Sequence, residues 1–167
     1  ANALEGRVAL VTGTSRGIGA AILEAFVKAG ATVVGTATSE AGAERITARI
    51  AELGGKGRGI VLNVCDGEAS AKAVVDTVAE FGRIDVLVNN AGITRDGLLM
   101  RMGDDAFDRV LDVNLKGTFN TTRALTKTFM RQRGGCVVNM SSVVGLMGNA
   151  GQANYAASKA GVIGLTK

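Results

Sequence analysis

The sequence contains no histidine, no proline and no tryptophan, and it has a single tyrosine. Without histidine, a Ser-His-Asp triad, a Cys-His pair and a histidine-ligated zinc site are all excluded. Any proton transfer must therefore use Tyr, Lys, Asp, Glu or Cys side chains. The net charge of +4 favours anionic partners. The charges are scattered, however, and aromatic stacking platforms are absent, so no nucleic-acid partner is expected.

Cysteine is also scarce, and long apolar runs are missing. Cys65 and Cys136 lie far apart and match no metal-binding or redox spacing, so no metal site is expected. No stretch resembles a signal peptide, and none approaches the ~18 apolar residues that a membrane span requires. We therefore expect a cytoplasmic protein without a membrane partner, in which both cysteines are reduced core thiols.

Glycine, in contrast, is abundant at 24 residues, which suits a fold with many tight strand–helix junctions. Short apolar runs alternate with longer segments of helical period, and such runs predict parallel strands covered on both faces. The pattern indicates a single α/β domain over residues 1–167, with a doubly wound, Rossmann-type parallel sheet. The predicted strands are Arg7–Thr12, Ala31–Thr36, Gly59–Val64, Ile84–Asn89 and Cys136–Met140. The predicted helices are Gly17–Lys28, Glu40–Leu53, Glu68–Phe81, Asp104–Arg131 and one from about Asn154, with Gly30, Gly54 and Gly82 ending the first three.

The strand count is low for this architecture. The common dinucleotide-binding sheet has six strands, and the sequence predicts only five. The final segment, Ala156–Lys167, ends within an apolar helical pattern that has no stop signal. We therefore expect a truncated chain that lacks its C-terminal strands, with apolar surface uncovered on the fifth strand and the last helix.

A glycine-rich turn, Thr12–Gly19, follows the first predicted strand and opens a helix. Glycines at such a junction let backbone N–H groups approach a pyrophosphate, which the helix N-terminus stabilises. The spacing is G-x-x-x-G-x-G rather than the common G-x-G-x-x-G. A purely structural turn is the alternative, but the position in the β/α pattern favours nucleotide binding.

The residues after the second strand indicate which nucleotide is bound. NAD-binding sheets place an acidic side chain there to hold the ribose 2′-hydroxyl, whereas this chain has Thr38 and Ser39. Glu40 comes next, but either preceding hydroxyl suits a helix N-cap, which makes Glu40 a first-turn residue. Arg16 in the glycine turn can offer a guanidinium to a 2′-phosphate. The sequence therefore favours NADPH over NADH.

The only tyrosine, Tyr155, stands four residues before Lys159, so in a helix both side chains lie on one face. A free phenol has a pKa near ~10 and is a poor acid or base at neutral pH. An ammonium group one turn away stabilises the phenolate and makes the phenol more useful for acid–base work. The alternative is amphipathic packing with a lysine that extends to solvent.

Together these features resemble the short-chain dehydrogenase/reductase family. The motifs are the Thr12–Gly19 turn, Asn63-Val64, Asn89-Asn90-Ala91-Gly92, Asn114, Ser142 and Tyr155-x-x-x-Lys159. The stretches Gly92–Met102 and Gly148–Tyr155 further resemble the 3-oxoacyl-[acyl-carrier-protein] reductases of type II fatty-acid synthesis. Reductases of acetoacetyl-CoA or other ketones are similar, and a nucleotide-binding fragment without catalysis is a further alternative.

The resemblance implies that NADPH delivers hydride to a 3-keto carbon while Tyr155 donates a proton to the developing alkoxide. Lys159 would activate the phenol and hydrogen-bond the nicotinamide ribose. Ser142 would hold the substrate oxygen, and its spacing to Tyr155 favours it over the adjacent Ser141. Asn114 would interrupt its helix and hold a water that links Lys159 to solvent; a satisfied buried amide is its alternative reading.

The same resemblance implies the cofactor contacts. Asn63 and Val64 would contact adenine, and Asn90 and Gly92 would flank the adenine-side ribose. The full predicted cofactor set is Gly13, Ser15, Arg16, Gly17, Ile18, Gly19, Thr38, Asn63, Val64, Asn90, Ala91, Gly92, Tyr155 and Lys159.

A stripe of basic residues near the end of the long predicted helix is a candidate surface for binding a partner protein. Arg123, Lys127 and Arg131 recur every four residues, and Arg133 follows. A solvated helix face is one reading. The resemblance implies another, in which Arg131 or Arg133 meets an acidic acyl carrier protein. It also implies a homotetramer built on the long helix and the final helix.

Overall fold

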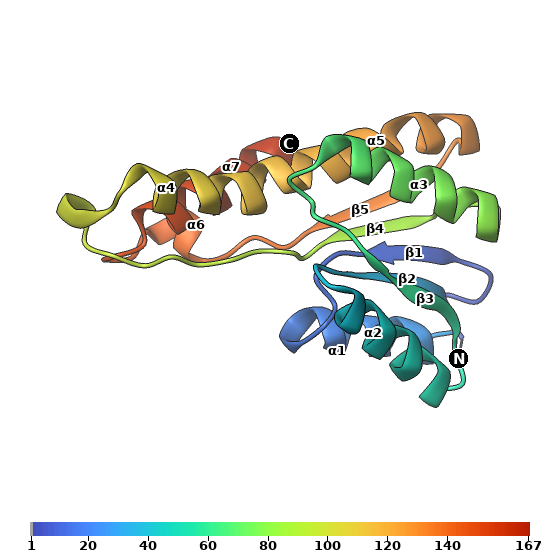
Figure 1. The fold of residues 1–167 in the computed structure, drawn as a ribbon. Helices are drawn as coiled ribbons and strands as arrows, with labels where there is room; N and C mark the ends of the chain where they lie inside the picture. Colours follow the sequence, from blue (N-terminus) through green and yellow to red (C-terminus); the bar gives the residue numbers. More distant parts are fainter. Residues whose placement is uncertain (1) are drawn as a thin grey trace.

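The computed structural model describes residues 2–167 and contains a five-stranded parallel sheet with helices on both faces (Figure 1). The chain begins at the centre of the sheet, moves out to one edge, and then returns to build the other side, in the order β3-β2-β1-β4-β5. The predicted doubly wound α/β fold is therefore confirmed. The strands are β1 Val8–Val11, β2 Thr32–Ala37, β3 Lys56–Val61, β4 Val86–Asn89 and β5 Cys136–Asn139.

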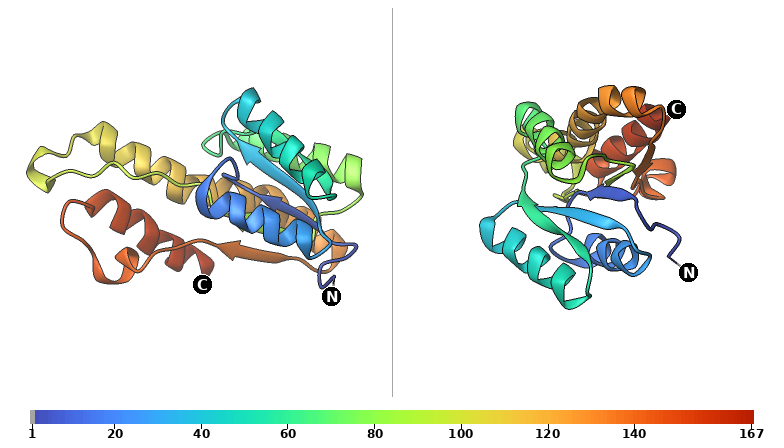
Figure 2. Two further views of the ribbon diagram at one scale, coloured as in Figure 1. Left: turned by 90° about the horizontal axis from the view of Figure 1, so that it is seen from below. Right: turned by 90° about the vertical axis from the view of Figure 1, so that its right-hand side faces the viewer.

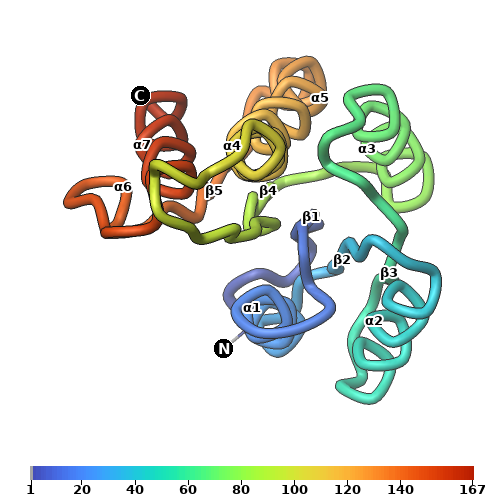
Figure 3. The backbone as a smooth tube through the Cα atoms, turned by 60° about the vertical axis from the view of Figure 1, so that its left-hand side comes forward, coloured from blue at the N-terminus to red at the C-terminus, as the bar shows by residue number. Residues whose placement is uncertain are grey.

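Two helices cover one face of the sheet, and the others lie over the opposite face or beyond its edge (Figure 3). The pair on the first face is α1 and α2, and β5 leads into α6 and α7, which pack on each other (Figure 2). The helices are α1 Gly17–Lys28, α2 Glu40–Glu52, α3 Gly67–Phe81, α4 Asp104–Leu111, α5 Gly117–Gln132, α6 Val144–Met147 and α7 Ala153–Thr166.

The central strand β1 is buried on both faces, as its unbroken apolar run predicts. Ala9 and Val11 pack in the cluster that also contains α1 and α2 residues. Val8 and Leu10 pack in the cluster on the other face, with residues of α3 and α5. The predicted helix ends are also confirmed, because Gly30, Gly54 and Gly82 follow the first three helices with positive φ angles of 90°, 69° and 83°.

The third strand begins three residues earlier than predicted and ends at Val61 rather than Val64. Its first residue pairs with Thr32 and its last with Ala37. Gly57 and Gly59 lie so close to neighbouring backbone that a Cβ at either position would overlap it. The strand lies at a sheet edge and is half-exposed, so it carries charged and glycine residues that hide it from a search for apolar runs.

The predicted helix over Asp104–Arg131 is interrupted. A π-helical turn, Asp112–Lys116, separates α4 from α5 and has Asn114 at its centre. This confirms the expected local break at Asn114. Two short elements were not predicted, the 3₁₀ helix Leu99–Arg101 and helix α6.

The prediction that both cysteines are core thiols is wrong. Cys136 is exposed and Cys65 is half-buried. Cys136 begins β5, which has a neighbour on one side only, so part of its apolar surface is uncovered. Val138 on β5 is 40% exposed and Leu165 on α7 is 41% exposed, as expected for these elements. Within residues 2–167, no helix combines the length and apolar character that a bilayer crossing demands.

A buried carboxylate ties the amino-terminal ends of β1 and β4 together. Asp85 is 7% exposed and accepts a hydrogen bond from the backbone N–H of Val8 at 2.9 Å. The Arg83 guanidinium donates to both carboxylate oxygens at 2.6–2.9 Å. Burial alone would raise the pKa of Asp85, but the bonds from Arg83 and Val8 outweigh burial and lower that pKa below its usual value.

Replacing this carboxylate should cost stability in a pH-dependent way. We expect Asp85→Asn to lower the free energy of unfolding at neutral pH by about 1–3 kcal/mol, because an amide cannot accept all of these bonds. The folded-state pKa lies below the unfolded value of ~3.9, so the stabilisation is complete above that value and is lost as the pH falls through the folded-state pKa. Urea unfolding of both proteins from neutral pH into this acidic range measures the difference. A cost that does not shrink on acidification would contradict this assignment.

Candidate cofactor cleft and active site

Two loops at the carboxyl-terminal edge of the sheet are bonded to each other. Thr12 directly follows β1, and its Oγ1 accepts hydrogen bonds from the backbone N–H groups of Asn90 and Ala91 at 3.1 and 3.0 Å. In return, the Asn90 amide donates to the carbonyls of Thr12 and Gly13 at 3.1 and 3.0 Å. A Cβ on Gly13 would lie 2.9 Å from Ala91 Cα, so only glycine permits this approach. We call these four bonds the Thr12–Asn90 clasp.

The turn held by the clasp fits an anionic group. Gly17, the first residue of α1, has a φ of +57° and faces open space where a side chain would stand. The N-cap residue Arg16 makes no side-chain capping bond, and the first turn of α1 carries no acidic residue. The first N–H groups of this helix are therefore free to bind a phosphate oxygen.

A cleft of about 420 Å³ opens beside this turn. It brings together every predicted cofactor residue from the glycine turn and from the ends of β2, β3 and β4. These residues are Gly13, Ser15, Arg16, Gly17, Ile18, Gly19, Thr38, Asn63, Val64, Asn90, Ala91 and Gly92. The sequence alone did not identify the other lining residues, which are Thr36, Ala37, Leu62, Ile93, Arg109 and Val113.

Arg109 is the most distinctive of these additional residues, because it comes from α4 rather than from a strand end. Its guanidinium also lies 3.9 Å from the sulfur of Cys65, just after β3. Burial raises the pKa of the Cys65 thiol, and the nearby Arg109 charge opposes this only in part. A single arginine on an exposed helix has no sequence motif, so only the fold reveals its position.

Tyr155 and Lys159 lie on α7 with their side chains facing each other. The Lys159 Nζ lies 5.7 Å from the centre of the Tyr155 ring and donates a 2.7 Å hydrogen bond to the Met140 carbonyl at the end of β5. Lys159 is 6% exposed, and burial lowers its pKa. The helix therefore presents a phenol beside a buried amine, the arrangement that the i, i+4 spacing predicted.

Both amide hydrogens of Asn114 and one lone pair of its Oδ1 are used inside the protein, as its alternative reading as a satisfied buried amide predicts, and one lone pair of Oδ1 is left. Its Oδ1 accepts from the Ile93 N–H at 2.8 Å, and its Nδ2 donates to the Ile93 carbonyl at 3.0 Å and to Ser158 Oγ at 3.1 Å. The side chain thus links the loop after β4 to α7. A Cβ on Gly92 would lie 3.3 Å from Asn114 Oδ1 and 3.7 Å from Lys159 Nζ. Because Gly92 also lines the cleft, the cleft and the α7 residues meet at this glycine.

The two adjacent serines after β5 make different bonds. Ser141 donates its hydroxyl to the Lys159 carbonyl at 2.9 Å, so its proton is used to hold α7. Ser142 only accepts a bond, from the Val144 N–H at 3.1 Å, and its hydroxyl proton stays available to a ligand.

Comparison with known proteins identifies the family. A family model described as short chain dehydrogenase matches residues 7–167. The chain belongs to this family. The Rossmann-type sheet with its glycine turn agrees with that membership.

Individual relatives of this dehydrogenase carry one common name. The chain is 54% identical over 164 residues to the 3-oxoacyl-[acyl-carrier-protein] reductase of Salmonella typhimurium and 56% identical over 165 residues to that of Vibrio harveyi. It is 51% identical over 164 residues to the reductase of the same name from Thermotoga maritima. Each match covers 98% of this chain. The chain spans 66% of the length of the first two relatives and 67% of the third.

The Thr12–Asn90 clasp should be necessary for stability. We expect Thr12→Val to cost about 2 kcal/mol of unfolding free energy, because valine matches the shape of threonine but leaves the N–H groups of Asn90 and Ala91 without their acceptor. Thr126→Val is the control, since it removes an exposed helix hydroxyl that bonds only to the Thr122 carbonyl. Chemical denaturation gives the unfolding free energy of both variants. If Thr12→Val were as stable as Thr126→Val, the clasp would have no structural role.

Proposed function

We propose that this protein reduces 3-oxoacyl-[acyl-carrier-protein] to 3-hydroxyacyl-[acyl-carrier-protein] in type II fatty-acid synthesis, with NADPH as hydride donor and Tyr155 as proton donor. The names of its relatives support the substrate. The single observation that carries the proposal is the meeting point at Gly92. There, the nucleotide-sized cleft adjoins the buried Lys159 amine, which faces the Tyr155 ring.

Bound NADPH would supply a hydride to the 3-keto carbon of the substrate. The glycine turn and the first N–H groups of α1 would hold its pyrophosphate, for which the open face at Gly17 leaves room. Asn63 and Val64 would contact the adenine, and Asn90 and Gly92 would flank the adjacent ribose. All four line the cleft.

The charges at the end of β2 support NADPH over NADH. Thr38 and Arg16 line the cleft there, and no carboxylate lines it. Glu40 lies in the first turn of α2. The N-cap of this helix is Ser39, which is one of the two N-cap residues, Thr38 and Ser39, that the sequence suggested. A ribose site with hydrogen-bond donors and no carboxylate favours a 2′-phosphate over a 2′-hydroxyl, because no negative side chain repels the phosphate.

The proton chemistry would be carried by the α7 pair. Tyr155 would give its hydroxyl proton to the substrate oxygen as that oxygen gains negative charge. Lys159 would stabilise the phenolate that forms, and its bond to the Met140 carbonyl holds it under the ring. Ser142 would donate its free hydroxyl proton to the same substrate oxygen. Asn114 would hold a water that returns a proton through Lys159.

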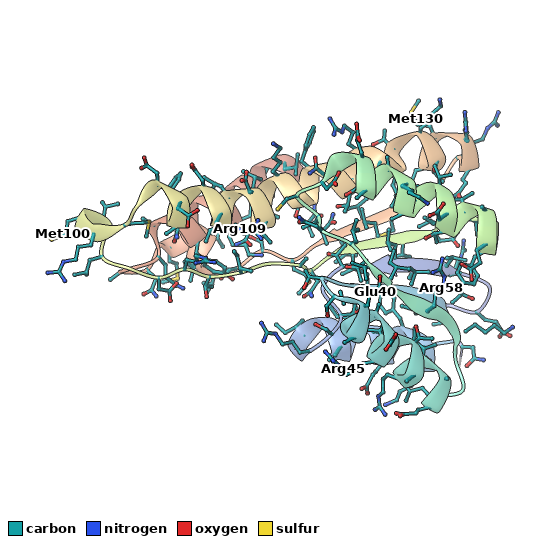
Figure 4. All side chains as sticks on the ribbon, in the orientation of Figure 1. Glu40, Arg45, Arg58, Met100, Arg109 and Met130 are labelled. Carbon is teal, nitrogen blue, oxygen red and sulfur yellow. The ribbon has the colours of Figure 1, made fainter. Side chains whose placement is uncertain are left out.

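The carrier protein is proposed to meet Arg131 and Arg133. Arg131 lies in the last turn of α5, and Arg133 follows that helix with a φ of 55°. Both are exposed. They lie near the start of β5, at the end of the molecule where Figure 4 labels Met130. The cleft lies at the other end, where the parallel strands finish. Carrier contact here therefore requires an acyl arm that reaches across the protein or into a neighbouring subunit of the proposed homotetramer.

Replacing the single tyrosine tests the chemistry. We expect Tyr155→Phe to lower kcat for 3-oxoacyl thioester reduction by at least about 100-fold, the typical contribution of a positioned general acid. The dissociation constant for NADPH should stay within about twofold, because the ring that faces Lys159 is retained. NADPH oxidation measured with carrier-bound and CoA-bound substrates gives the rates and also separates the two substrate classes. Normal turnover by the phenylalanine variant would disprove the proton-donor role.

A further inference from the structure

A second cavity, of about 410 Å³, adjoins the cofactor cleft at the end of β2. It shares four residues of the glycine turn and the β2 end with the cleft, among them Arg16 and Thr38. It adds Ser39, Gly42 and Arg45 from the beginning of α2. The two hollows therefore adjoin along these residues, and a group attached to a nucleotide in the first would lie next to the second.

The Arg45 side chain turns back along its helix toward this cavity. Its Nη2 lies 3.9 Å from the point that a Cβ on Gly42 would occupy, so the guanidinium lies over the first turn of α2. Figure 4 shows Arg45 on the part of α2 that lies beside α1. A Cβ on Gly42 would also lie 2.8 Å from Ala37 Cβ, and the absence of that atom keeps the floor of the cavity open.

The cavity presents donors and positive charge without a balancing carboxylate. Arg16 and Arg45 are its two charged lining residues. The ion pairs formed within residues 2–167 use neither of them. Arg49, one turn further along α2, differs because it pairs with Glu24 and Glu52. Two uncommitted guanidiniums with neighbouring hydroxyls form a suitable site for a phosphate monoester.

We propose that Arg45 is a second guanidinium that binds the 2′-phosphate of the adenosine ribose together with Arg16, and so determines the preference for NADPH. This inference rests on the proposed function, because that proposal puts the nucleotide in the cleft. The end of β2 is where Rossmann-type sheets read the ribose 2′ position. The cavity lies at that point, beside Thr38, and not beside the pyrophosphate turn alone.

The test compares two ligands that differ only in the 2′-phosphate, adenosine 2′,5′-bisphosphate and adenosine 5′-monophosphate. Isothermal titration calorimetry gives both dissociation constants for the wild-type protein and for each variant. We expect Arg45→Ala to weaken bisphosphate binding about tenfold, as for loss of one charge-assisted bond, and to change monophosphate binding by less than about twofold. Arg45→Glu should weaken bisphosphate binding further, because its carboxylate repels the phosphate.

Lys56→Ala is the matched control. Lys56 is an exposed residue that begins β3 and pairs with Thr32 at the start of β2, at the other end of these strands from the cavity. Its removal changes the net charge by the same amount as Arg45→Ala. It should leave both dissociation constants within about twofold of the wild type. Thermal unfolding of each variant verifies that the exposed Arg45 position tolerates substitution.

Three results would overturn the inference. If Arg45→Ala binds the bisphosphate as tightly as the wild type while Arg16→Ala does not, Arg16 alone reads the phosphate. If Arg45→Ala weakens both nucleotides equally, Arg45 has no specific role at the 2′ position. If the wild-type protein binds neither nucleotide, the proposed function fails and the inference fails with it.

Discussion

The Thr12–Asn90 clasp is the interaction on which the rest of the site depends. Parallel strands β1 and β4 are neighbours, but the chain leaves them toward opposite faces of the sheet, so the loops that follow naturally diverge. The cleft opens between the diverging loops. The clasp limits how far the loops separate, because it bonds them to each other where they leave the strands. Because both loops line the cleft, the clasp determines the relative position of its two walls.

A second set of hydrogen bonds connects the loop after β4, which lines the cleft, to α7. The loop after β4 continues to Ile93, which Asn114 holds through two hydrogen bonds, and Asn114 also bonds Ser158. Asn154 donates to the Arg95 and Ala106 carbonyls and accepts from the Tyr155 N–H. Within residues 2–167, no buried side-chain polar atom lacks a partner. A network of this kind fixes the backbone of α7 at Tyr155 relative to the loop after β4.

Much of this was predictable from sequence, because the signals are local. The strands β1, β2 and β4 are buried on both faces and read as apolar runs, and the glycine turn and Tyr155–Lys159 pair have recognisable spacings. β3 was misplaced because an edge strand tolerates glycine and charge. The exposure of Cys136 was missed because it depends on which strand lies at the edge.

Other features depend on the path of the chain in space. Arg45 and Arg109 lie on helices where nothing in the local sequence marks them, and only the packing of α2 and α4 near the strand ends brings them to the two cavities. The distance of Arg131 from the cleft follows from the direction in which α5 runs. Asn114 illustrates both kinds of information, since the helix break was expected but its bonds to Ile93 and Ser158 were not.

The most direct test of the account follows the hydride itself. The full protein would be supplied with a 3-oxoacyl-carrier-protein and NADPH deuterated at both hydrogens of the nicotinamide C4, and the product examined by mass spectrometry. We expect a 3-hydroxyacyl product that carries one deuterium at its third carbon. A product without deuterium, or no reduction at all, would contradict the central claim that this short chain dehydrogenase reduces a ketone by hydride transfer in the cleft beside Tyr155.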